Sequence, residues 1–293
     1  MKNILSVLAC MAAVLSPARA AGLKVFISVD MEGVSGVVSE DQASATGKDY
    51  ERFRRMMTDE ANAAIDGAVA GGATQVVVND SHGGMRNLLI EELHAPAELT
   101  SSNLKPLGMM QGIDSSFDAV IFVGYHAKAG SAEGVLAHTG SGTIRDLRIN
   151  GRSVGEGGMN IHAAGAVGVP VVMITGDQVA IAQARELVPN IEGVQVKEAI
   201  GPLAARSLRP EEVVKRIREG AARAVKRHAE IKPVPASMPV RFDVQFSQPV
   251  LALMAEQIPT VERTGADSIS FQNDDYLRGY RFFRVLYKFI LVN

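Results

Sequence analysis

The sequence predicts an α/β fold, a three-layer sandwich around a mainly parallel sheet, with a smaller C-terminal α+β unit. Short, continuous apolar runs alternate with longer amphipathic stretches, which is the pattern of strands buried on both faces and joined by helices. A cluster of prolines then precedes a segment with a different order of elements. These two observations together predict the fold class.

Composition indicates an ordinary globular protein with a sizeable core. The chain has 293 residues, of which 47% are hydrophobic and 21% are charged. Its 30 basic and 32 acidic residues are spread along the sequence and give a net charge of -2. Because no basic region would attract a polyanion, we expect no nucleic acid partner.

Residues 1–20 have the pattern of a secretory signal peptide. Lys2 provides the positive start, residues 4–15 are almost entirely apolar, and Ala18-Arg19-Ala20 is a small-x-small cleavage site. The alternative is a membrane anchor, but the apolar run is shorter than the roughly 20 residues that a spanning helix needs. We therefore expect export, no membrane span after removal of the leader, and a periplasmic or secreted protein.

Cys10, the only cysteine, lies within this leader. Its position leaves lipidation open, although the apolar stretch before it is short. Cleavage after Ala20 would give a mature chain without a disulfide, so its stability would come from the core and any bound metal.

The first predicted domain, residues 21–230, follows the order strand, helix, strand. The expected strands are the apolar runs at 25–29, 75–78, 119–124 and 169–175. A helix is expected at 48–70, where Gly71-Gly72 ends it. Further along, a strand at 147–149 meets an Asn150-Gly151 turn, and helices follow at 157–167 and 210–228.

The second predicted domain, residues 231–293, begins at the proline cluster of Pro233, Pro235 and Pro239. Beyond it the pattern predicts a strand at 240–246, a helix at 249–257, a strand at 268–272 and a last helix from Asp274. This order is typical of a small α+β unit.

Metal-ligand side chains recur where the first three predicted strands end, and ligands of open α/β sheets bind beyond the carboxyl ends of the strands. Asp30 and Glu32 end the first strand, His82 ends the second and His126 the third. Two carboxylates two residues apart share one face of a strand and repel each other unless a cation or a proton lies between them. Each histidine can give one nitrogen to a metal while a second group, for which Asp80 is a candidate, holds the other.

Two loop residues extend this set. Glu156 lies between glycines at a predicted helix start, where a carboxylate would repel a phosphate, so a metal ligand fits better; a helix-capping role is the alternative. His138 lies in a loop of small and polar residues and could act as a general acid or base. Five ligands exceed what one tetrahedral zinc with an open position requires, and they suit two ions sharing a hydroxide, which predicts amide or ester hydrolysis.

At these residues the sequence resembles the zinc-dependent D-aminopeptidase family, the self-compartmentalising metallopeptidases associated with dipeptide-transport operons. The resemblance covers residues 24 to about 180 and rests on the segments Ser28-Val29-Asp30-Met31-Glu32-Gly33, Val78-Asn79-Asp80-Ser81-His82, Gly124-Tyr125-His126-Ala127, His138 and Asn150-Gly151 through Val154-Gly155-Glu156.

The resemblance implies an α/β metallopeptidase with two zinc ions per chain. It implies that Asp30 bridges the ions, that Glu32, His82, His126 and Glu156 complete their coordination, and that His138 is the catalytic residue. It also implies a homo-oligomer, commonly a decameric ring with its active sites facing an inner chamber. Familiar members lack a signal peptide, so the substrate of this chain could differ, and D-Ala-containing peptides from cell-wall turnover are plausible substrates.

The predicted function is therefore an exported dinuclear zinc aminopeptidase that hydrolyses short peptides with D-amino-acid N-termini, such as D-Ala-D-Ala. A dinuclear phosphoesterase remains an alternative because similar ligands serve phosphoryl transfer. A non-catalytic periplasmic solute- or metal-binding protein is a third possibility. The ligands do not distinguish D from L substrates.

Overall fold

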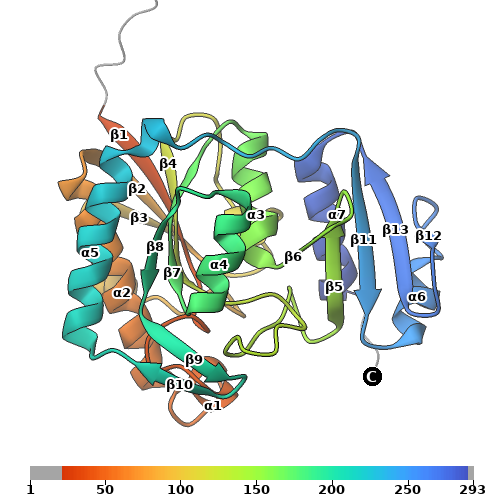
Figure 1. The fold of residues 1–293 in the computed structure, drawn as a ribbon, viewed down its shortest axis with the longest axis horizontal. Helices are drawn as coiled ribbons and strands as arrows, with labels where there is room; N and C mark the ends of the chain where they lie inside the picture. Colours follow the sequence, from red (N-terminus) through yellow and green to blue (C-terminus); the bar gives the residue numbers. More distant parts are fainter. Residues whose placement is uncertain (1–21, 290–293) are drawn as a thin grey trace, which may run out of the picture.

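The computed structural model describes residues 22–289 as two sheets with their helices (Figure 1). The predicted leader and Cys10 lie outside the described residues. Among residues 22–289, no helix combines the length and apolar character needed to cross a membrane.

The central sheet has six strands, all parallel, in the order β3-β2-β1-β4-β7-β8. Its strands are β1 (Leu23–Val29), β2 (Ala73–Asp80), β3 (Ala97–Thr100), β4 (Ala119–Tyr125), β7 (Val171–Gly176) and β8 (Glu192–Gln195). Every residue of β4 and β7 is buried, which explains their uninterrupted apolar sequences. This confirms the predicted α/β class with a mainly parallel sheet.

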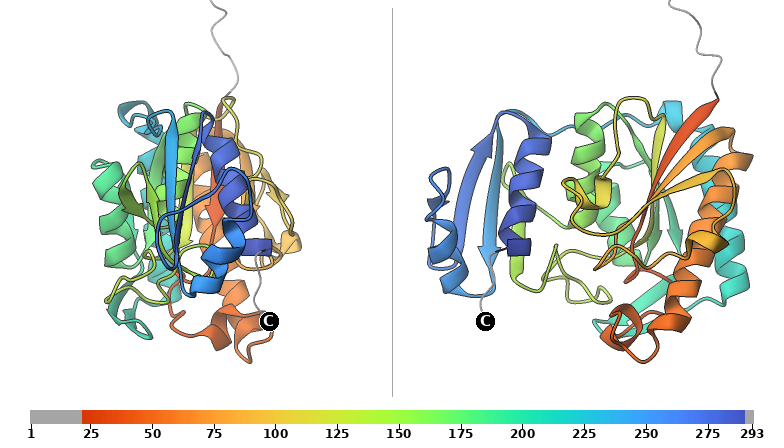
Figure 2. Two further views of the ribbon diagram at one scale, coloured as in Figure 1. Left: turned by 90° about the vertical axis from the view of Figure 1, so that its right-hand side faces the viewer. Right: turned by 180° about the vertical axis from the view of Figure 1, so that it is seen from behind.

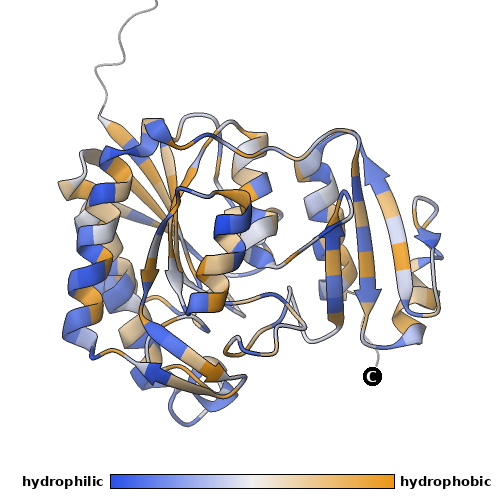
Figure 3. Cartoon of the chain, viewed as in Figure 1, coloured by the Kyte–Doolittle hydropathy of each residue, from blue (hydrophilic) through white to orange (hydrophobic). Residues whose placement is uncertain are grey.

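Helices cover both faces of this sheet. On one face lie α2 (Tyr50–Ala70) and α5 (Pro210–Lys226), and on the other lie α3 (Glu156–Ala166) and α4 (Gln178–Leu187). The helices α2 and α5 pack closely at Gly67, where a Cβ atom would lie 2.4 Å from the backbone oxygen of Arg218. Figure 3 shows the strands largely hydrophobic and α5 hydrophilic over much of its surface, as expected for an outer layer.

The second sheet is antiparallel, in the order β12-β13-β11-β5-β6. Its strands are β5 (Ile144–Ile149), β6 (Arg152–Val154), β11 (Val240–Phe246), β12 (Glu262–Arg263) and β13 (Ser268–Asn273). Asn150 and Gly151 have φ angles of 52° and 83°, as expected for the predicted hairpin turn. The sheet thus takes strands from both sides of residue 231, because β5 pairs with β11 about a hundred residues later in the chain.

Helix α7 (Tyr276–Phe289) lies between α3 and the second sheet, whereas α6 (Pro249–Ala255) packs on β11 and β13 (Figures 1 and 2). The Tyr276 hydroxyl donates to the backbone oxygen of Met159 at 2.8 Å, and the Tyr280 hydroxyl donates to Asn160 Oδ1 at 2.8 Å. The smaller unit is therefore bonded directly to α3, the helix that begins with Glu156.

Several short elements had no recognised sequence signal. They are the helix α1 (Glu40–Ala43), the strands β3, β8 and β12, the hairpin of β9 (Lys197–Gly201) and β10 (Ala204–Ser207), and the 3₁₀ turns Ile90–Glu92, Gly108–Met110 and His228–Glu230. The longer helix α4 was also not predicted. The predicted helices, in contrast, match α2, α3 and α5 to within two residues at each end.

Candidate metal centre

The site lies where the order of strands in the central sheet reverses. From β1 the chain adds β2 and β3 on one side, and later β4, β7 and β8 on the other, so the switch point falls between β1 and β4. Asp30 and Glu32 follow β1, and His126 follows β4. The two strand ends approach closely at Gly124, which has a φ of +68° and would place a Cβ atom 2.2 Å from the Asp30 backbone oxygen, so this position requires glycine.

His82, just after β2, faces the carboxylates of Asp30 and Glu32. Its Nδ1 lies 3.0 Å from Glu32 Oε2 and 3.3 Å from Asp30 Oδ1. Its Nε2 lies 2.8 Å from the Ala43 backbone oxygen, which can only accept a hydrogen bond. Nε2 therefore carries a proton, and Nδ1 faces the two carboxylates. Burial opposes ionisation of His82, but the charge of Glu32 raises its pKa well above the usual range, so Nδ1 also carries a proton, which a bound cation would replace.

His126 is held in the same way with its nitrogens exchanged. Its Nδ1 donates to the Ala127 backbone oxygen at 2.9 Å, and its Nε2 points toward Asp30 Oδ2 at 3.5 Å and Glu156 Oε2 at 3.4 Å. Within residues 22–289, His126 Nε2 and Asp30 Oδ2 are both buried without a hydrogen-bond partner. Buried polar atoms are rarely left unpaired, so these two facing atoms suit a bound cation.

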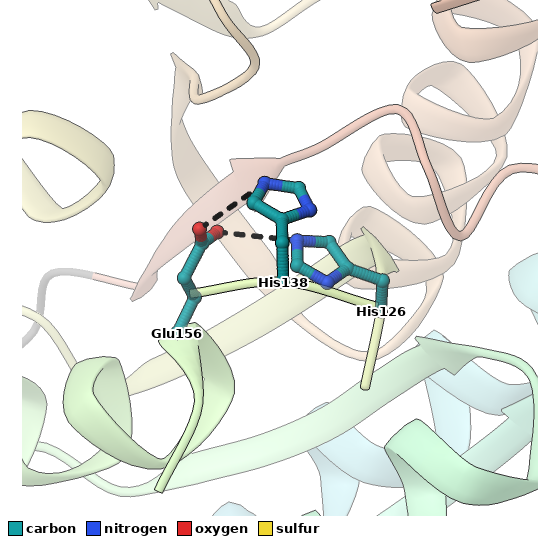
Figure 4. A group of neighbouring side chains, drawn as sticks. All are labelled: His126, His138 and Glu156. Carbon is teal, nitrogen blue, oxygen red and sulfur yellow. Dashed lines mark ion pairs between the residues drawn. The ribbon is translucent and has the colours of Figure 1, made fainter. Parts of the chain in front are cut away.

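Glu156 and His138 complete the cluster (Figure 4). Glu156 is the first residue of α3, and its Oε1 accepts a hydrogen bond from Gly140 N at 2.6 Å. His138 donates Nδ1 to the Leu136 backbone oxygen at 2.9 Å, and its Nε2 lies 3.6 Å from Glu156 Oε1. Its ring stacks on that of His126 with 4.1 Å between the centroids. His138 is about 30% exposed, whereas His126 and Glu156 are buried.

The electrostatics of the cluster call for a positive charge. Burial, and then the neighbouring charge of Glu32, raise the pKa of Asp30 to about 8. Burial opposes ionisation of His126 and Glu156 as well, but their mutual attraction raises the pKa of His126 to about 10 and lowers that of Glu156 to about 2. Protons thus balance three converging carboxylates, and metal ions could replace those protons.

The donor atoms form two overlapping groups that share His126. One group is His126, His138 and Glu156, and the other is Asp30, Glu32 and His126; in each, the ligand atoms lie within 4.8 Å of one another. His82 lies outside both groups but contacts Asp30 and Glu32. The structure therefore brings all six sequence-predicted site residues together, and the donor set of carboxylates and imidazoles suits zinc.

One supporting role predicted from the sequence is wrong. Asp80 does not hold a histidine ring; its carboxylate accepts hydrogen bonds from the backbone nitrogens of Asn87 and Leu88. Asn87 in turn donates Nδ2 to the His82 backbone oxygen at 2.7 Å, so Asp80 fixes the loop that follows His82. The histidine rings are held by backbone carbonyl oxygens instead, and a backbone carbonyl leaves no signal in the sequence because every residue has one.

A buried lysine also supports the site, and the sequence did not indicate it. Lys197, 1% exposed on β9, donates its Nζ to the backbone oxygens of Glu32, Val34 and Val37. Glu60 of α2 accepts a hydrogen bond from Ser35 N at 2.8 Å in the same loop. The segment that carries Glu32 is thus fixed from two sides by residues distant in sequence.

Comparison with known proteins identifies the family. The family model described as "D-aminopeptidase" matches residues 23–285. The chain belongs to the D-aminopeptidase family. A D-aminopeptidase of Bacillus subtilis (strain 168) is 39% identical over 261 residues, covering 88% of this chain and 94% of that protein.

A solved structure of this family has the same fold. It is described as "Zn-dependent D-aminopeptidase DppA from Bacillus subtilis, a self-compartmentalizing protease", and it matches with a TM-score of 0.90 and 36% identity over 92% of this chain and 99% of that one. The resemblance inferred from the motifs is therefore confirmed over nearly the whole chain, including the C-terminal unit that the motifs did not cover. Family membership supports a peptidase function.

Proposed function

We propose that this protein is a dinuclear zinc aminopeptidase that hydrolyses short peptides with D-amino-acid N-termini, such as D-Ala-D-Ala. The observation that carries the proposal is the buried convergence of three carboxylates and three imidazoles, with Asp30 Oδ2 and His126 Nε2 unpartnered among the described residues. The related DppA is described as Zn-dependent, and the donor set here is of the kind zinc prefers.

In this proposal Asp30, Glu32, His82, His126 and Glu156 hold the ions. Asp30 is the candidate bridge because its two oxygens face different histidines, Oδ1 toward His82 and Oδ2 toward His126. Bound zinc would supply a hydroxide at neutral pH and a Lewis acid for the peptide carbonyl. The carbonyls of Ala43 and Ala127 fix the two rings, so that Nδ1 of His82 and Nε2 of His126 face inward before any ion binds.

His138 is the proposed catalytic residue. The Leu136 backbone oxygen fixes a proton on Nδ1, and Nε2 faces the pocket beside Glu156. It is more exposed than the other site histidines, so substrate can reach it. Its Nε2 is therefore placed to accept a proton and return it to the departing amine, as general acid–base catalysis requires.

The remaining parts of the proposal concern place and assembly. The leader pattern of residues 1–20 supports export to the periplasm or outside the cell, where D-Ala-containing peptides are plausible substrates. The description of DppA as self-compartmentalizing supports a homo-oligomer, for which we propose a decameric ring.

The test is metal analysis of the purified protein combined with a substrate panel. We expect about two zinc ions per chain, loss of activity on chelation, and cleavage of D-Ala-D-Ala in preference to L-Ala-L-Ala and to a chromogenic phosphate ester. Peptide binding without cleavage at full metal occupancy would instead support a binding protein, and faster hydrolysis of the phosphate ester would support a phosphoesterase.

A further inference from the structure

Helix α7 adds a positive charge to the pocket that holds the candidate metal ligands. That pocket is lined by Asp30, Glu32, His82 and Glu156, and also by Tyr287 and Lys288 near the end of α7. The Tyr287 ring packs against Gly140, where a Cβ atom would lie 3.1 Å from it, and Gly140 N donates to Glu156. Helix α7 is therefore fixed relative to the carboxylates.

Two neighbouring basic side chains, Lys105 and Arg284, already have hydrogen-bond partners, whereas Lys288 has none within the described residues. Lys105 donates Nζ to Asn79 Oδ1 at 2.8 Å and to the Asp80 backbone oxygen at 2.7 Å, and Arg284 donates to the Tyr287 hydroxyl at 3.1 Å. Lys288 Nζ lies 5.6 Å from the centre of the Tyr287 ring, and no carboxylate of residues 22–289 forms an ion pair with it. Its half-buried ammonium is thus available to an anion in the pocket.

Lys288 also lies between the pocket and a second hollow. It lines a second hollow together with Leu104, Val285, Arg281 and Arg284. Lys288 is the residue that the two hollows share, so its side chain lies at the edge of the space that holds the candidate metal ligands. A ligand in that space would have its reacting group at the metal ligands and a negative charge at Lys288.

We propose that Lys288 binds the α-carboxylate of a short peptide whose scissile carbonyl lies beside His138. This rests on the proposed peptidase function. In a dipeptide the free carboxylate follows the scissile carbonyl after one residue, roughly 3.5 Å of chain, so an ammonium on the pocket wall is the complementary group. The substrate class is therefore dipeptides with a free C-terminus, and longer or C-terminally blocked peptides lose this contact.

The experiment compares D-Ala-D-Ala with its C-terminal amide on the zinc-loaded wild-type protein, Lys288→Met and Lys288→Arg. Methionine keeps the length of the side chain and removes only the charge. Arg281→Met is the matched control, because Arg281 lines the second hollow but not the pocket with the metal ligands. The measured quantity is kcat/KM for each peptide.

We expect Lys288→Met to lower kcat/KM for the free acid by about 10- to 100-fold, as for loss of one charge-assisted hydrogen bond, and to change the amide by less than about twofold. Lys288→Arg should restore most of the loss, and Arg281→Met should change the ratio of the two substrates by less than about twofold. An equal loss of kcat/KM for both peptides would mean that Lys288 acts on the reacting carbonyl or on the fold, and it would overturn the proposal.

Failure of the proposed function is distinguishable from failure of this inference. If the zinc-loaded wild-type protein cleaves neither peptide, the peptidase proposal falls. Calorimetric binding of the same two peptides to the wild-type and Lys288→Met proteins then decides the inference, because equal Kd values for acid and amide on the wild-type protein would refute a carboxylate site.

Discussion

Replacing Lys197 by methionine tests whether the buried ammonium fixes the loop that carries Glu32. Methionine preserves the unbranched side chain but removes all three hydrogen bonds to the backbone oxygens of Glu32, Val34 and Val37. The Val34 oxygen still accepts from Val37 N at 3.2 Å, but within the described residues the oxygens of Glu32 and Val37 lose their donor.

Two buried carbonyls left without a donor cost about 1–3 kcal/mol each. Removal of a buried charge offsets part of this cost, since burial already lowers the pKa of Lys197 to about 8. We therefore expect the free energy of unfolding to fall by about 2–4 kcal/mol for Lys197→Met.

The assay is urea unfolding followed by far-ultraviolet circular dichroism, since the chain has no tryptophan. Chelator is present throughout, so that metal affinity does not enter the measured stability. Lys226→Met, at an exposed position in the last turn of α5, is the control and should change stability by less than about 0.5 kcal/mol. A loss at Lys197 no larger than that of the control would refute the reasoning.

Three further predictions concern the site and its surroundings. His138→Ala should keep the zinc content measured by mass spectrometry while kcat falls by about 10²- to 10⁴-fold, and a zinc-replete variant with full activity would exclude the proposed role. Asp30→Asn should lower the zinc content per chain at pH 7 and yet raise the stability of the chelated protein by about 2 kcal/mol, because burial disfavours the charge of Asp30; unchanged zinc content would contradict it. Burial raises the pKa of Glu60 from 4.5 to about 8. Between these pH values Glu60 keeps its proton in the folded protein and releases it in the unfolded chain, so the contribution of Glu60 to stability falls as pH rises from about 4.5 to 8. Glu60→Gln should therefore gain about 2–4 kcal/mol relative to the wild type between pH 5 and 8, measured by urea unfolding at each pH, and a difference independent of pH would show that Glu60 is not protonated in the fold.

The central sheet and the ligands were predictable because their signals are local. A strand buried on both faces is a continuous apolar run, and Asp30, His82 and His126 each follow such a run directly. Parallel strands bring their carboxyl ends to one edge, so the convergence of these residues follows from the fold class alone. Glu156 and His138 lie in loops, so their position beside the strand ends does not follow from the fold class, although their residue types and neighbouring small residues already suggested a ligand and an acid–base residue.

The supporting contacts could not be predicted, because they join residues far apart in the chain. The pairing of β5 with β11 depends on a register between residues about a hundred positions apart, which no local pattern encodes. Lys197 lies in a short strand whose sequence gives no reason for a buried lysine, and its partners are backbone oxygens. The backbone oxygens of Ala43 and Ala127, which orient two histidines, are equally invisible because any residue could supply them.

The pattern of hydrogen bonds indicates that the centre is formed before metal binds. His82, His126 and His138 each have one ring nitrogen on a backbone oxygen, at 2.8, 2.9 and 2.9 Å, so each ring has a single orientation that directs its other nitrogen into the site. The backbone around Glu32 is fixed by Lys197, and the Glu156 carboxylate by Gly140 N. Because the ligands lose little conformational freedom on binding, the free energy of metal binding is not spent on ordering them. The main cost of metal binding is instead the release of the protons shared by the carboxylates and imidazoles. Zinc affinity should therefore rise with pH over the range in which His126 releases its proton.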